Sequence, residues 1–127
     1  MGTSIDTIEL TLPFKPEYVS IARLTASGVA NRVGFDIETI EDIKVAISEV
    51  CSKLVSIGSK TAEKYSLLFR ISENGLDIVF QCEDSSLKCI FRDDTDELGL
   101  SIITALMDKL ELCTGNGSYL LSMSKAL

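Results

Sequence analysis

Apolar residues recur at alternating spacings of three and four between Asp36 and Gly58, the most regular pattern in the chain. That period places one stripe of an α-helix against a core. Asp36 is a typical N-cap, acidic residues follow it in the first turn, and Gly58 is a typical stop signal. We therefore predict a long core helix, with a stripe formed by Ile40, Ile43, Ile47, Val50, Leu54 and Ile57.

The segment before this helix predicts a strand and another helix. Residues 5–12 alternate between apolar and polar, which is the period of a half-buried strand. Pro16 fits the first turn of a helix that continues to about Val33, where Gly34 ends it. One side of that helix is apolar and the other is polar, with Arg23 on the polar side.

The segment after the central helix predicts a hairpin. Residues 65–72 and 76–83 alternate in the manner of strands, and Asn74-Gly75 lies between them. Both turn residues tolerate the positive φ that a tight primed turn requires, so we expect two antiparallel strands joined there. Residues 88–92 favour a further short strand or a sheet edge.

The last part of the chain predicts a helix and a second hairpin. Residues 93–96 are polar and acidic and end in a helix cap, and apolar residues repeat at helical spacing over about 97–110. Residues 111–114 and 118–124 flank a Gly-Asn-Gly turn at 115–117. The whole order favours an α+β fold, in which the helices pack on one face of a mostly antiparallel sheet.

Composition narrows the class of protein. A chain of 127 residues fits one domain over 1–127, large enough to bury a core without disulfides or a metal. The net charge of −7 repels phosphate backbones, so we expect a protein partner or a small ligand and no nucleic acid. No long apolar run and no leader pattern occurs, which predicts a cytoplasmic protein that contacts no membrane.

The four cysteines show no C-x-x-C spacing, and the chain has no histidine. A structural zinc site and Ser-His or Cys-His catalysis are therefore not expected. Cys51 lies within the predicted central helix, and the other three cysteines lie in or beside apolar segments. Their pattern indicates small buried hydrophobic side chains.

Two stretches are more specific than the fold pattern: PEYVSIARLTASGVANRVGF at residues 16–35 and EDIKVAISEVCSK at residues 41–53. They resemble the anti-sigma factor serine kinases of the GHKL ATPase superfamily, which act in bacterial partner switches. Leu98-Gly99-Leu100, with the helix that follows, extends the resemblance over most of the chain. It implies a GHKL-type α/β sandwich, with a mixed, mostly antiparallel sheet and about three helices on one face.

The resemblance also implies an activity. Such proteins dimerise, bind a sigma factor, and phosphorylate a serine of an antagonist protein with Mg-ATP. By this resemblance Glu49 stands at the catalytic glutamate, and Arg23 on the first helix at a partner contact. Lys53 occupies the position of the magnesium-binding asparagine, although an ammonium group is a donor only and cannot ligate magnesium.

The other nucleotide positions also depart from the family pattern. Cys82 replaces the aspartate of the adenine-reading Asp-x-Gly motif, and Asp84 replaces its glycine. The lid region before the last helix, residues 85–96, contains no glycine to cradle phosphates. Glu97 replaces the first glycine of the pre-helix motif that continues with Gly99, and its carboxylate repels a triphosphate.

Together these features predict an anti-sigma-factor-like regulator that acts by protein binding, without ATP turnover and without a cofactor. Its partners are a sigma factor, an anti-anti-sigma antagonist or both, and it pairs as a homodimer or heterodimer through the first helix. The alternative is an active serine kinase that phosphorylates the antagonist with Mg-ATP. Two further alternatives are metal-free nucleotide binding through Lys53 and an adenine contact from Glu83 or Asp84 after a register slip.

Overall fold

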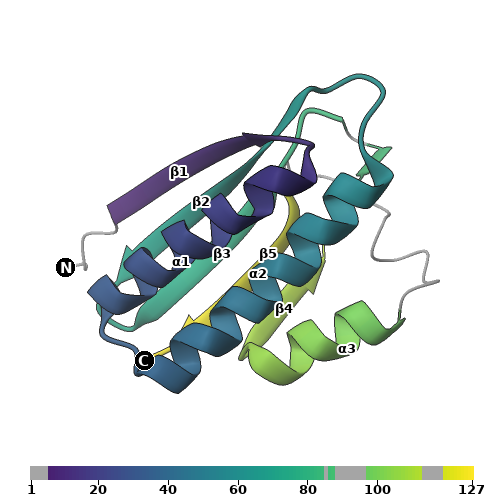
Figure 1. Ribbon diagram of the computed structural model, residues 1–127. Helices are drawn as coiled ribbons and strands as arrows, with labels where there is room; N and C mark the ends of the chain where they lie inside the picture. Colours follow the sequence, from purple (N-terminus) through teal and green to yellow (C-terminus); the bar gives the residue numbers. More distant parts are fainter. Residues whose placement is uncertain (1–5, 85, 88–96, 113–118) are drawn as a thin grey trace.

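The computed structural model describes residues 6–84, 86–87, 97–112 and 119–127 (Figure 1). The first strand begins in the alternating segment, and Pro16 begins the first helical turn, both close to the predicted positions. In chain order the elements are β1 (Asp6–Pro13), the 3-10 helix η1 (Pro16–Tyr18), α1 (Val19–Val33), α2 (Ile37–Ile57), β2 (Lys64–Ser72), β3 (Gly75–Gln81), α3 (Glu97–Leu106), β4 (Lys109–Leu112) and β5 (Tyr119–Ala126).

The described strands form one five-stranded sheet in the order β1-β2-β3-β5-β4. Each neighbouring pair runs antiparallel. The described α-helices lie on one face of this sheet, and α2 lies between α1 and α3 (Figure 1). The predicted α+β sandwich is therefore confirmed, and the sheet that we expected to be mostly antiparallel is antiparallel at every described pairing.

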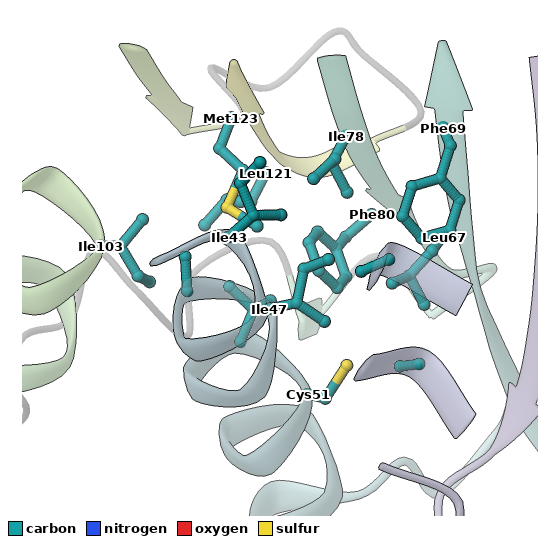
Figure 2. Close-up of a cluster of buried hydrophobic side chains, with 14 of the residues drawn as sticks. Ile43, Ile47, Cys51, Leu67, Phe69, Ile78, Phe80, Ile103, Leu121 and Met123 are labelled. Carbon is teal, nitrogen blue, oxygen red and sulfur yellow. The ribbon is translucent and has the colours of Figure 1, made fainter. Parts of the chain in front are cut away.

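The apolar stripe of α2 forms the centre of the core. Ile43 and Ile47 are fully buried, and in Figure 2 they face side chains from the strands while Ile103 points in from α3. Full burial of side chains of this size stabilises the fold by about 1.5–3 kcal/mol each. Ile57, which we expected in the same stripe, is 50% exposed because it is the last residue of α2.

Both predicted ends of α2 are confirmed. The Thr39 amide donates to Oδ1 of Asp36 at 2.8 Å, which caps the first turn. This bond lowers the pKa of the Asp36 carboxyl group. At the other end the Gly58 amide donates to the Leu54 carbonyl at 2.7 Å, and Gly58 adopts a φ of +67°, which other residues rarely adopt.

The β2–β3 hairpin turns one residue earlier than we predicted. Its register pairs Ser72 with Gly75, so the turn residues are Glu73 and Asn74, and neither has a positive φ. Gly75 instead opens β3 at a φ of +155°, where a Cβ atom would collide with the backbone carbonyl of Lys125 in β5. The prediction of a primed Asn74-Gly75 turn is therefore wrong. Gly75 belongs to β3, and the close approach of the β5 backbone leaves no room for a side chain at this position.

The last helix is shorter than we predicted. α3 ends at Leu106, and Leu110 lies in β4. Asp108 separates the two elements: its amide donates to the Ser124 carbonyl at 3.0 Å, and its carboxylate accepts from the Ala126 amide at 2.6 Å. Pairing with β5 thus overrides the helical spacing of the apolar residues.

Some predictions concern residues outside the described ranges. These are the strand at 88–92, the capping loop at 93–96 and the glycine turn at 115–117. The strands on either side of that last turn, β4 and β5, pair antiparallel as expected.

Candidate functional site

The central helix has two flanks that face different neighbours. α1 lies on one side of α2 and α3 on the other (Figure 1). Lys44 and Ser48 line the flank toward α1. Because successive helical residues rotate by about 100°, Lys53 lies on the side of α2 opposite Lys44. Glu49 precedes Lys53 by one turn, and both side chains are half-buried.

The first turns of α3 carry two more of the candidate nucleotide positions. Glu97 is the first residue of α3, and Gly99 is a buried residue two positions further on. α3 packs against α2 and sends Ile103 into the shared core (Figure 2). The fold therefore brings the helix that carries Glu49 and Lys53 next to the helix that carries Glu97 and Gly99.

Cys82 directly follows β3 and is half-buried against the core. Its Sγ donates to the carbonyl oxygen of Lys64 at 3.6 Å. Desolvation by burial raises the pKa of this thiol, so it stays protonated at neutral pH. A protonated thiol is a weak hydrogen-bonding group, whereas the resemblance implies a carboxylate at this position.

Both carboxylate oxygens of Asp84 accept hydrogen bonds from within the protein. Oδ2 accepts from the Ser59 hydroxyl at 2.5 Å, and Oδ1 accepts from the hydroxyl and amide of Ser86 at 2.6 Å and 3.0 Å. The bond from Ser59 and then those from Ser86 lower the pKa of Asp84. The carboxylate is therefore ionised and already holds three donors.

Ser59 is a residue that the sequence reading missed. It appears there only as the start of a polar stretch after the central helix. In the structure its Oγ also accepts from the amides of Thr61 and Ala62 at 3.2 Å and 2.9 Å. A serine whose hydroxyl accepts from amides two or three residues later is a common turn motif, and a serine at the start of a polar connection could have suggested it.

A groove runs along the outside of the helical layer between α1 and α2. It consists of two adjoining hollows of about 450 Å³ and 580 Å³. We call it the outer groove, and its lining residues are Pro16, Glu17, Val19, Ser20, Arg23, Leu24, Glu41, Lys44, Val45, Ser48, Ser52, Val55 and Ser56. Arg23 and Ser20 line both hollows, so the groove is continuous at their position.

Arg23 is the exposed cation at the centre of this groove. Within the described parts of the chain its guanidinium group makes no salt bridge or hydrogen bond, whereas Lys44 across the groove pairs with Glu41 at 3.0 Å. Leu24 and Val45 at the groove are 71% and 45% exposed. The sequence reading did not single out Leu24 or Val45, although both are apolar residues that lie off the buried stripe of their helix.

The profile of the family described as histidine kinase-like ATPase domain matches residues 12–125. The serine-protein kinase RsbW of Halalkalibacterium halodurans is 36% identical to this chain, over 96% of the chain and 84% of the relative. Proteins of the same name from Bacillus velezensis and Bacillus pumilus are 33% and 32% identical, over 92% and 100% of this chain and 84% and 90% of the relatives. With this similarity over its whole sandwich, the chain belongs to the histidine kinase-like ATPase family, among the anti-sigma factor serine-protein kinases.

Proposed function

We propose that this protein is an anti-sigma-factor-like regulator of transcription that acts by protein binding in a partner switch, without ATP turnover. The observation that carries the proposal is the outer groove. Arg23 lies there without an ionic partner among the described residues, beside the exposed Leu24 and Val45. An exposed guanidinium group attracts the carboxylates of a partner, and covering apolar side chains stabilises the complex.

We expect the partner to be a sigma factor, an anti-anti-sigma antagonist or both, and we place the protein in the cytoplasm. Among the described helices, none has the length and apolar character needed to cross a membrane. We also propose that α1 forms a homodimer, or a heterodimer with an intact kinase paralogue. Ile21 on α1 is 39% exposed, which supports a contact there. Light scattering of the protein alone and mixed with the paralogue tests this proposal.

The residues at the family's nucleotide positions do not fit Mg-ATP. Lys53 offers an ammonium group where magnesium requires an oxygen ligand. The carboxylate of Asp84 already holds three donors, and Cys82 is a protonated thiol that donates to the backbone. We therefore propose that the protein works without a cofactor.

The alternative is an active serine protein kinase that uses Mg-ATP to phosphorylate an antagonist. The relatives named serine-protein kinase favour it, as does Glu49, which is half-buried on α2 and which the resemblance places at the catalytic glutamate. Calorimetric titration with ATP, with and without magnesium, separates the two functions. We expect no binding heat at millimolar ATP, whereas binding that needs magnesium supports the kinase. If ATP binds without magnesium and Lys53→Ala abolishes this binding, Lys53 supplies the positive charge that magnesium would otherwise provide.

A capture experiment tests the binding function directly. The immobilised protein is mixed with candidate sigma factors and antagonists, and the bound protein is quantified. We expect capture by the wild type and loss of capture by Arg23→Glu. Arg32→Glu is the matched control, because Arg32 is an exposed arginine of α1 nine residues later, about 180° away around the helix. Failure of the wild type to capture any of these proteins would contradict the proposal.

A further inference from the structure

One carboxylate joins two loops at the same end of the sheet. Ser59 lies just beyond α2 and Asp84 just beyond β3, and the Ser59 hydroxyl donates to Oδ2 of Asp84 at 2.5 Å across 25 positions of sequence. The other carboxylate oxygen accepts both bonds from Ser86. The acceptor is ionised, and charge-assisted hydrogen bonds are roughly twice as strong as neutral ones.

Ser59 transmits this constraint to the backbone. While its hydrogen goes to Asp84, its oxygen accepts from the amides of Thr61 and Ala62. The hydroxyl thus uses its donor and both of its lone pairs. Gly58, directly before it, turns the chain out of α2 through a left-handed φ. The start of the α2–β2 connection is therefore tied through one side chain to the end of β3.

We propose that Asp84 and Ser59 form a latch that holds the α2–β2 connection against the end of β3. Amides in surface connections are commonly satisfied by water, but here two of them are satisfied by a serine whose own proton is held by a carboxylate. Asp84 stands where the family resemblance implies the glycine of the adenine-reading motif. The latch thus uses a carboxylate at a position where the resemblance implies no side chain. It is independent of the proposed binding function, because neither latch residue lines the outer groove.

Amide hydrogen exchange of the full-length protein, with residue resolution, tests the latch. Asp84→Ala removes the carboxylate without touching Thr61 or Ala62, and we expect exchange at those two amides to rise by roughly tenfold or more. Asp84→Asn keeps one carbonyl acceptor and should give a smaller rise. Asp77→Asn is the control, because Asp77 is exposed on β3 and its carboxylate makes no hydrogen bond or salt bridge within the described residues.

Exchange at Thr61 and Ala62 that does not change in Asp84→Ala would overturn the latch. If Asp84→Ala does not fold, the smaller rise expected in Asp84→Asn, which preserves the shape of the side chain, is measured at the same two amides, and no rise there would overturn the latch. A rise that spreads equally to fully buried β2 residues such as Leu67 would also overturn it, because it would indicate global destabilisation. Capture of sigma factor or antagonist is measured with the same variants and should remain unchanged, so failure of the latch and failure of the binding function are distinguishable.

Discussion

The outer groove and the end of β3 differ in how their polar groups are satisfied. On the α1 side, Arg23 lies exposed in the outer groove without a partner among the described residues. At the end of β3, Asp84 and Cys82 direct their polar atoms to Ser59, Ser86 and the backbone of Lys64. A binding surface needs groups whose hydrogen-bonding capacity is unused. The outer groove offers such a group in Arg23, whereas Asp84 and Cys82 at the end of β3 bond within the protein.

This difference has a physical consequence for how the domain can change. Both regions are positioned by the same core, which is built around the apolar stripe of α2. Polar residues in one region can therefore be replaced without loss of the core that positions the other. We propose that this chain uses the outer groove for binding, while Asp84 and Cys82 act as part of the scaffold.

The largest expected effect comes from weakening the core that positions both regions. Ile47→Ala removes a fully buried side chain from the centre of α2 and should lower the free energy of unfolding by about 2–5 kcal/mol, from the lost burial and the cavity that remains. Urea unfolding measures it. Ile57→Ala, at the half-exposed end of the same helix, is the matched control and should cost much less. Equal losses would contradict the assignment of the core.

The next effect acts on the groove alone. Arg23→Glu reverses the unpaired charge and should weaken capture of the partner by roughly 10- to 100-fold. The free energy of unfolding should stay unchanged, because Arg23 makes no described polar contact. Titration calorimetry with the captured partner measures the first quantity and urea unfolding the second. The same loss of affinity in Arg32→Glu would show that the effect is not local to the groove.

A third effect concerns acid stability. Hydrogen bonds from Thr39, from Ser59 and Ser86, and from Ala126 lower the pKa values of Asp36, Asp84 and Asp108. Each carboxylate has a folded pKa below its unfolded value, so its contribution is complete above the unfolded pKa of about 3.9 and is lost as the pH falls through the folded pKa. We therefore expect the urea concentration at the midpoint of unfolding to fall as the pH is lowered below about 4. Asp84→Asn should show a shallower drop, and a slope identical to that of the wild type would count against this assignment.

The smallest effect compares a core cysteine of α2, Cys51, with Cys82 at the end of β3. Burial raises the pKa of the Cys51 thiol to about 11, and no part of its surface is exposed. Cys82 is only half-buried. At pH 8 the native protein should therefore be alkylated more slowly at Cys51 than at Cys82, by roughly tenfold or more, since the reagent attacks exposed thiolate. Mass spectrometry of the labelled peptides gives both rates, and faster labelling of Cys51 would contradict the packing of α2 against the core.

Much of the fold could be predicted from local pattern. The stripe, the cap at Asp36 and the stop at Gly58 all depend on residues within one or two turns of one another, and the structure confirms them. The alternation of residues 5–12 and 65–72 likewise predicts β1 and β2. The α/β sandwich of the family was indicated by the same stretches that carry the resemblance.

The sequence by itself determined the elements, because helical and strand periodicity depend on the nearest neighbours in the chain. Only the tertiary structure decided the end of α3, where Asp108 bonds to β5, and the role of Gly75, which faces the backbone of Lys125. The same holds for the bond of Asp84 to Ser59 and for the groove that places Arg23 between two hollows. These features join residues far apart in sequence, and local periodicity contains no information about which distant groups will meet.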